Sequence, residues 1–185
     1  MATIKKISSE YISSHQYFTA KRDAYKTNTG KIVDPYFVVE LPPCVAALAI
    51  TEEGKVIMIK QYRYPINEVC LEIPGGFIDK NETAEKAIAR ELLEETGYIF
   101  SAFFYLGKTF ANPGVLNNCT HLFLATGGKK VASQSLDANE EIEILLYNID
   151  EVKQFITEGL IKQALHELCI YKAFQQLQVL NNNNE

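Results

Sequence analysis

The segment from Thr83 to Thr96 constrains the fold more than any other part of this chain. It is built from Ala, Leu, Glu, Lys and Arg, which are strong helix formers. Thr83 is suited to cap the start, Glu85 suits the first turn, and Gly97 can end the helix in a left-handed conformation. We therefore predict a helix over 83–96.

Carboxylates lie on the face of this helix that its apolar residues use for packing. At about 100° per residue, Glu91 and Glu95 fall on the same side as Ala84 and Ile88, and Glu94 borders that side. A surface helix normally places its acids on the opposite face, because burying an unpaired charge costs free energy. Taken alone, the acids also fit a solvated helix face, which is the simpler alternative.

A compensating positive charge is needed if these acids are buried. Arg90 is the nearby cation in the helix, and one guanidinium cannot neutralise three carboxylates. Oxygen donors without Cys or His among them favour Mg²⁺, with Mn²⁺ as a substitute, and such ions bind phosphates. The upstream Gly75-Gly76 pair has no side chains to keep a metal or a substrate away from the backbone. The pattern therefore predicts a metal site for a phosphate-bearing ligand.

Charge and composition exclude several classes of protein. The chain has 18 Lys and Arg against 23 Asp and Glu, a net charge of −5, so neither nucleic acid nor a membrane surface is an expected partner. No apolar run reaches the roughly 18 residues of a membrane span, and no apolar stretch follows Lys5 and Lys6, which favours a cytoplasmic protein. Four widely spaced cysteines are expected to be reduced and mostly buried: Cys44, Cys70, Cys119 and Cys169.

Periodicity and turn residues predict a small β extension over 1–43, a main domain over 44–180 and a disordered tail over 181–185. In the extension, strands over 17–20 and 32–40 flank an Asn28-Thr29-Gly30 turn. The main domain is expected to have a polar loop over 127–141. Its other predicted elements are strands over 44–50, 56–59, 100–110, 120–125 and 142–149 and, besides the helix above, helices over 150–158 and 161–180.

The spacing of residues in the middle of the chain closely resembles the signature box of the Nudix hydrolases. Tyr98 is the one departure, because the family usually has a bulky aliphatic residue there. The positions that match the box are Gly76, Glu82, Arg90-Glu91-Leu92, Glu94-Glu95 and Gly97.

Further motifs are similar to the ADP-ribose pyrophosphatase branch of that family. Where the branch commonly has an acidic residue shortly after Pro-Gly, this chain has Asn117-Asn118. The matching stretches are Gln61-Tyr62-Arg63-Tyr64, Glu72-Ile73-Pro74-Gly75-Gly76, Asn112-Pro113-Gly114 and Glu158-Gly159-Leu160-Ile161.

This resemblance implies hydrolysis of the diphosphate bond of a nucleoside diphosphate linked to a sugar, with ADP-ribose giving AMP and ribose 5-phosphate. One alternative is a hydrolase of other nucleotide sugars such as GDP-mannose, and another is a sensor that binds ADP-ribose-type ligands without cleaving them. The implied fold is an α/β/α sandwich with a mixed central sheet and a small N-terminal β extension. The family also implies a homodimer in which the extensions are exchanged.

By the same resemblance, the metal ligands are Glu91, Glu94, Glu95 and the carbonyl of Gly75. Glu94 and Arg90 have catalytic roles, Arg90 by holding the carboxylates in place. Glu82 supports the helix. The acidic loop before residue 142 supplies the general base, with Glu140 as the candidate and Glu141 in reserve.

Four residues are expected to bind substrate, and for three of them a simpler structural role is also open. Arg63 is suited to pair with the diphosphate or terminal sugar, or else forms a surface salt bridge. Tyr36 and Phe37 are stacking platforms for the base or else core residues, and Pro113 is similar to the branch's specificity marker. The histidines are expected to be structural: His15, His121 and His166.

Overall fold

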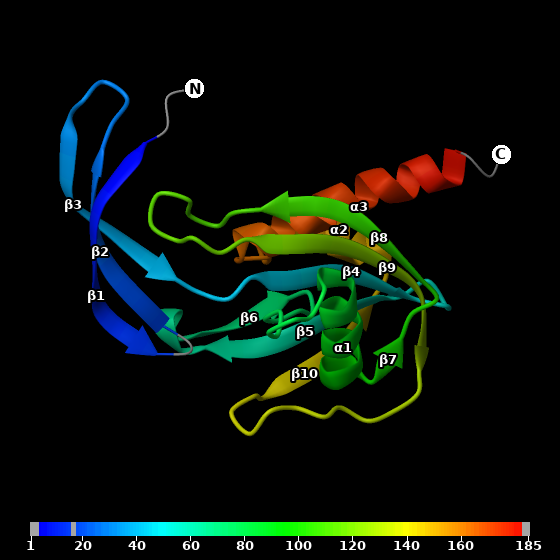
Figure 1. Ribbon diagram of the computed structural model, residues 1–185. Helices are drawn as coiled ribbons and strands as arrows, with labels where there is room; N and C mark the ends of the chain where they lie inside the picture. The colour runs from blue at the N-terminus through cyan, green and yellow to red at the C-terminus, as the bar shows by residue number, and fades with distance from the viewer. Residues whose placement is uncertain (1–3, 16–17, 183–185) are drawn as a thin grey trace. The chain divides into compact units, whose positions relative to one another are not determined.

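The computed structural model describes residues 4–15 and 18–182 of the chain (Figure 1). It divides into two compact units. The first is Met1–Pro43 with Phe110–Cys119, and the second is Cys44–Thr109 with Thr120–Glu185. The first unit therefore includes a segment from the middle of the chain.

The first unit is an antiparallel sheet in the order β1-β2-β3, formed by Lys5–His15, Phe18–Lys26 and Ile32–Glu40. The predicted hairpin is β2 and β3, whose turn includes Gly30 at a φ of +89°; Tyr17 lies outside the described residues. The strand β1 was not predicted, because its residues are almost all exposed and show no buried face. Pairing with β2, a tertiary contact, is what makes this segment a strand.

The second unit contains a mixed sheet in the order β10-β5-β4-β9-β7, with β6 also paired to β5 and β8 to β9. The pairing of β4 with β9 is parallel and the other pairings are antiparallel. Its strands are β4 (Cys44–Thr51), β5 (Val56–Arg63), β6 (Glu68–Glu72), β7 (Tyr98–Ile99), β8 (Ala102–Thr109), β9 (Thr120–Lys130) and β10 (Ile142–Tyr147).

Helices cover both faces of this sheet (Figure 1). The helix α1 (Ala84–Thr96) packs on one face, and α2 (Ile149–Thr157) and α3 (Ala164–Asn182) pack on the other. The central strand β4 supplies both cores by alternation: Val45, Ala47 and Ala49 belong to the α1 side, and Ala46, Leu48 and Ile50 to the α2 and α3 side. The predicted α/β/α sandwich with a mixed sheet is confirmed.

Two expectations about the second unit need correction, and one strand was not predicted. The predicted loop over 127–141 begins later, because β9 continues to Lys130, where it pairs with β7; Gly127 fits a bulge with a φ of +67°. The strand β6 was not predicted. The helix α3 continues through Asn182, two residues into the expected tail, and 183–185 lie outside the described residues. Within the described ranges, no helix is long and apolar enough to cross a bilayer.

Candidate active site

The helix α1 starts and ends where the sequence predicts. Thr83 caps its start, where its Oγ1 accepts a hydrogen bond from the Lys86 backbone N–H, and Gly97 ends it at a φ of +74°. Ala87, Ile88 and Leu92 are buried against the sheet, and Glu95 is buried with them. The packing of α1 therefore carries a carboxylate into the interior.

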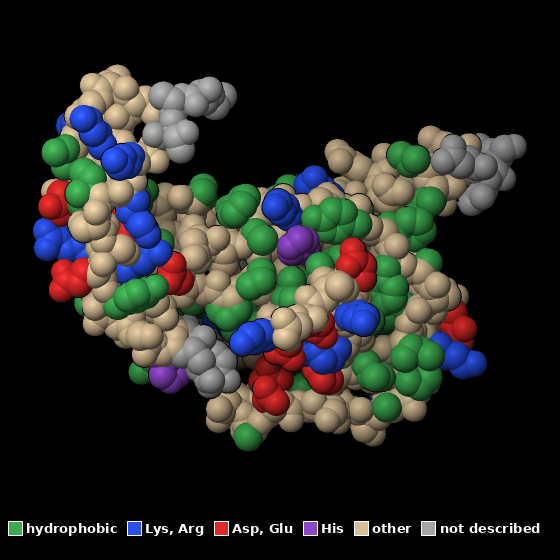
Figure 2. All heavy atoms as spheres, viewed as in Figure 1, with side chains coloured by type: hydrophobic (Ala, Val, Ile, Leu, Met, Phe, Trp, Pro, Cys, Tyr) green, Lys and Arg blue, Asp and Glu red, His purple; other side chains and the backbone are tan. Residues whose placement is uncertain are grey.

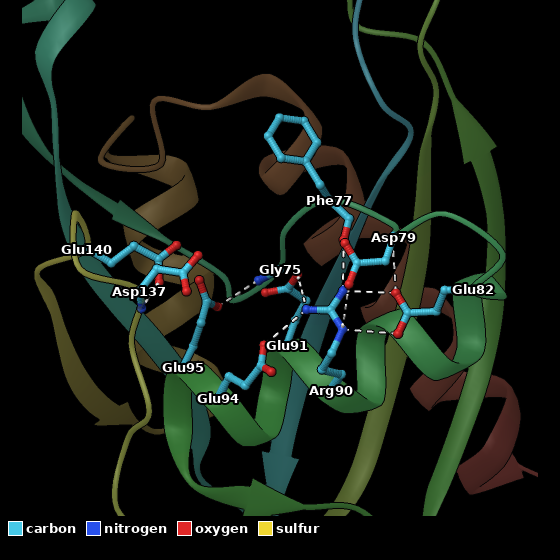
Figure 3. A network of polar contacts seen from close by, with 10 residues as sticks. All are labelled: Gly75, Phe77, Asp79, Glu82, Arg90, Glu91, Glu94, Glu95, Asp137 and Glu140. Carbon is cyan, nitrogen blue, oxygen red and sulfur yellow. Dashed lines mark hydrogen bonds and ion pairs between the residues drawn. The ribbon is translucent and has the colours of Figure 1, made fainter. Parts of the chain in front are cut away.

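Arg90 is the centre of an ion-pair network on this helix (Figure 3). Its Nε and Nη2 donate to the two carboxylate oxygens of Glu82 at 3.0 and 2.9 Å, and its Nη1 donates to Glu91 at 2.8 Å and Glu94 at 3.0 Å. Nη2 also donates to the carbonyl of Phe77 at 2.9 Å. The guanidinium holds the pKa of Glu82 below its usual range. Arg90 thus fixes the loop before α1 to the acids on α1.

Glu95 and Glu91 are carboxylates with too little compensating charge. Glu95 accepts a hydrogen bond from the Gly75 N–H at 2.9 Å, and in the described part of the chain Arg90 pairs with other acids and not with Glu95. Burial raises the pKa of Glu95 to about 8 and that of Glu91 to about 7, the second despite the contact with Arg90. This environment favours either a proton or an added cation at these two groups.

The Gly75-Gly76 pair lets the backbone lie against these acids. A Cβ on Gly76 would lie 2.5 Å from the carboxylate carbon of Glu91, and one on Gly75 would lie 2.2 Å from the carbonyl oxygen of Val45. The Gly76 carbonyl accepts from the Val45 N–H at 2.8 Å, which anchors the pair to the edge of β4. Any side chain at either position would displace β4 or the Glu91 carboxylate.

These residues fit a hard divalent cation by their chemistry. The donors are all oxygens, Glu95 is buried and Glu91 is partly buried, and the glycines leave the backbone close to them. Within the described ranges, no three His, Cys, Asp or Glu side chains are arranged to hold an ion, and Arg90 draws Glu91 and Glu94 toward itself. Glu91, Glu94, Glu95 and the Gly75 carbonyl are the groups that would hold it. In Figure 2, acidic and basic side chains gather around α1.

The loop before β10 lies beside α1, and hydrogen bonds fix it there. The Gln134 amide donates to the carbonyls of Glu95 at 2.7 Å and Ile142 at 3.1 Å, and the Ser135 N–H donates to the Glu94 carbonyl at 2.8 Å. This arrangement places Glu140 near the acids of α1, as Figure 3 shows.

Glu140 and Glu141 are not equivalent. Glu140 is half-buried, and its carboxylate accepts from the Asp137 N–H at 3.2 Å. Its charge contributes to the raised pKa of both Glu91 and Glu95, which places it within electrostatic range of them. Glu141 is exposed. Of the two predicted bases, Glu140 is the one with this electrostatic link to the site.

Arg63, at the end of β5, is held by a buried acid. Its Nε and Nη2 donate to the two oxygens of Glu72 at 2.9 and 2.6 Å, and the Glu72 side chain is only 2% exposed. Arg63 itself is 40% exposed, and its charge lowers the raised pKa of Glu95. The expected alternatives were a substrate contact and a surface salt bridge. The observed pair has one buried partner and one exposed edge, so it differs from a surface bridge.

Three predicted site residues belong to the first unit. Tyr36 donates from its hydroxyl to the Gly114 carbonyl at 2.7 Å, next to Pro113, and its ring packs edge-on against Tyr25. The Phe37 side chain is exposed. Their roles toward a substrate stay predictions.

Asn117 and Asn118, which stand where the family branch commonly has an acidic residue, also make hydrogen bonds within the first unit. Asn117 Oδ1 accepts from the Leu41 N–H at 3.2 Å, and Asn118 Nδ2 donates to the Pro42 carbonyl at 3.2 Å. The Asn118 amide therefore donates to the backbone, which a carboxylate could not do, whereas the Asn117 oxygen accepts as a carboxylate would.

Sequence reasoning assigned no site role to Glu72, Gln134 or His166. Glu72 was noted only as part of a motif, although an acid beside the buried run of Ile73 and Pro74 signals a paired charge. Gln134 lies in a polar loop that gives no pattern. His166 was expected to be structural; it is buried with its Nδ1 3.6 Å from Glu72, a proximity that sequence does not encode.

Comparisons with known proteins give a family and a fold for this chain. Residues 40–168 match the family model described as NUDIX domain. A methanol dehydrogenase activator from Bacillus methanolicus is 37% identical over 122 residues, 65% of this chain and 66% of that protein. An ADP-ribose pyrophosphatase from Bacillus subtilis is 32% identical over 143 residues, 69% of this chain and 77% of that protein. A crystal structure of an ADP compounds hydrolase shares the fold, with a TM-score of 0.83 at 16% identity over 97% of both chains.

Proposed function

The chain belongs to the NUDIX family, and on that premise we propose that it hydrolyses ADP-ribose to AMP and ribose 5-phosphate, using Mg²⁺ that Mn²⁺ can replace. The resemblance to the ADP-ribose pyrophosphatase branch is confirmed by the family match and the relatives. The chain is accordingly a Nudix diphosphohydrolase, and hydrolysis of nucleoside diphosphate sugars is the class of reaction. What we propose beyond this class is that ADP-ribose is the substrate and that Mg²⁺ is the metal.

One observation carries this proposal: two insufficiently compensated carboxylates, the buried Glu95 and the partly buried Glu91, lie against the Gly75-Gly76 backbone. A protein that did not need an added cation would gain stability by replacing these acids with apolar residues. A non-catalytic sensor would have no use for all three acids of α1. Their retention supports an enzyme.

The reaction requires attack of water on one phosphorus of the diphosphate. When bound, Mg²⁺ neutralises the phosphate oxygens and lowers the pKa of water. Glu140 takes the proton from the attacking water, and the oxygen of that water forms a bond to phosphorus. The bridging P–O bond breaks, and its electron pair stays on the departing phosphate. Arg63 binds a phosphate oxygen through the guanidinium edge that Glu72 does not occupy. Arg90 keeps Glu91 and Glu94 oriented.

A substrate panel tests the proposal. ADP-ribose, GDP-mannose, UDP-glucose and nucleoside triphosphates are each incubated with the protein and Mg²⁺, and products are identified by mass. We expect AMP and ribose 5-phosphate from ADP-ribose, and no turnover in excess EDTA. A preference for GDP-mannose would change the substrate but keep the class, whereas equal or better turnover of triphosphates would refute the branch.

Matched variants assign the activity to this site. Glu95→Gln keeps an acceptor for the Gly75 N–H and removes the charge, so we expect a loss of about 10²-fold or more in kcat with the fold intact. Glu85→Gln changes an exposed acid on the same helix and should keep full activity. Near-normal turnover by Glu95→Gln would show that the acids of α1 do not hold the catalytic ion.

A further inference from the structure

The proposed mechanism gives no role to the buried imidazole of His166, at the start of α3. The His166 side chain is 10% exposed, and its Nδ1 makes no hydrogen bond with any residue in the described part of the chain. Buried nitrogen atoms are nearly always paired in folded proteins, so an orphaned one needs an explanation.

The group that faces this nitrogen is the acid that anchors Arg63. Nδ1 lies 3.6 Å from Oε2 of Glu72, and Oε2 is also the acceptor for Nη2 of Arg63 at 2.6 Å. A carboxylate is an acceptor, so Nδ1 must carry the hydrogen for the contact to be attractive. Approach by about 0.4 Å would complete a hydrogen bond. Glu72 thus lies between His166 on α3 and Arg63 at the end of β5.

The charge state of each member suits this arrangement. Burial lowers the pKa of His166 to about 4, so the imidazole is neutral near pH 7. A neutral imidazole can donate a hydrogen bond to Glu72, and Arg63 then remains the cation that pairs with the Glu72 carboxylate. The Glu72 carboxylate in turn raises the pKa of Arg63, which stays cationic.

A second contact ties the same two elements together. Lys162, just before α3, pairs with Glu68 at the start of β6. Glu68 and Glu72 are the two ends of β6, so both ends of this strand contact residues at or near the N-terminus of α3. The strand that carries Glu72 is therefore fixed relative to His166.

We propose that His166 is a positioning residue: it holds Glu72, and through Glu72 it fixes the guanidinium of Arg63 with one edge presented to the diphosphate. Nε and Nη2 of Arg63 both donate to Glu72. The orientation of the Glu72 carboxylate therefore sets the direction in which Nη1 of Arg63 points. A hydrogen bond from Nδ1, formed on that closer approach, would stop the Glu72 carboxylate from rotating and so keep the direction of Arg63 fixed. The substrate contact of Arg63 rests on the proposed function, whereas its orientation by His166 does not.

The orientation is tested in substrate-free protein by NMR of the Arg63 side chain. Exchange of its Nε–H with water should be slow in the wild type and about 10-fold faster or more in His166→Phe, which keeps a ring but removes the donor. His166→Asn places an amide N–H near the position of Nδ1 and should restore slow exchange. Cys169→Ala, another buried change on α3, is the structural control and should leave exchange unchanged. Unaltered exchange in His166→Phe would refute the positioning role.

The consequence for the reaction is tested by a double-mutant cycle. We expect His166→Phe to lower kcat/KM by about 10-fold alone and by less than about 2-fold in an Arg63→Ala background, because its effect passes through Arg63. Equal losses in both backgrounds would refute the coupling. If exchange responds as expected while the wild type hydrolyses no diphosphate, the proposed function fails and the positioning role stands.

Discussion

At the scale of single residues, the acids of α1 make the stability of this protein depend on pH and on cations. Burial raises the pKa of Glu91 to about 7 and that of Glu95 to about 8 in the absence of a metal. The same groups titrate near pH 4.3 in an unfolded chain. Between these values the folded protein binds more protons than the unfolded protein, so the free energy of unfolding falls as pH rises.

We therefore expect the melting temperature in EDTA to fall between about pH 5.5 and pH 8.5, and Mg²⁺ to raise it more at the higher pH. At the lower pH, protons compete with the cation for the same oxygens. Differential scanning calorimetry at both values measures this. Glu95→Gln should flatten the slope in EDTA, and a wild-type slope of the opposite sign would contradict the burial of these acids.

At the scale of elements, the end of α1 is fixed by a glycine that meets the segment after β9. Gly97 has a φ of +74°, and its carbonyl accepts from the N–H groups of Val131 and Ala132 at 2.9 and 3.2 Å. A Cβ at Gly97 would lie 2.1 Å from the Ala132 carbonyl oxygen. Gly54 has a similar φ of +78°, but a Cβ there would meet nothing within 4 Å.

This pair of glycines separates backbone strain from steric clash. Gly54→Ala should lower the free energy of unfolding by about 1–2 kcal/mol, the cost of a left-handed conformation. Gly97→Ala should cost more, because Ala132 must also move, and it should lower activity by shifting the loop that carries Glu140. Urea denaturation and kinetics measure both effects. Equal losses in the free energy of unfolding for the two variants would show that the segment after β9 moves away from the added methyl group at no cost in free energy.

At the scale of the whole molecule, the first unit exposes apolar side chains on its strands, including Ile7, Ile12 and Phe37. Exposed apolar side chains of this kind can be covered in a contact between two chains. The family resemblance implies a homodimer, and we expect sedimentation equilibrium to give twice the chain mass of 20.9 kDa. Ile12→Lys should shift the equilibrium toward the monomer, with Ser14→Lys on the same strand as an exposed control. A wild-type monomer at all concentrations would contradict the homodimer.

The sequence by itself determined the features whose signals are local. The start and end of α1 follow from Thr83 and Gly97, the acids follow from fixed offsets along one helix, and the apolar run of Cys44 to Ile50 predicts the strand β4. These patterns are readable because helix caps, the 3.6-residue helical period and apolar runs involve residues close together in the chain.

Only the tertiary structure decided the features that depend on distant partners. The strand β1 has no buried face to mark it, and the end of β9 depends on pairing with β7. Glu72 lies between Arg63 and His166 because β5, β6 and α3 converge. Such contacts join residues far apart in the chain, and their free energy comes from burial and pairing that no local pattern of residues encodes.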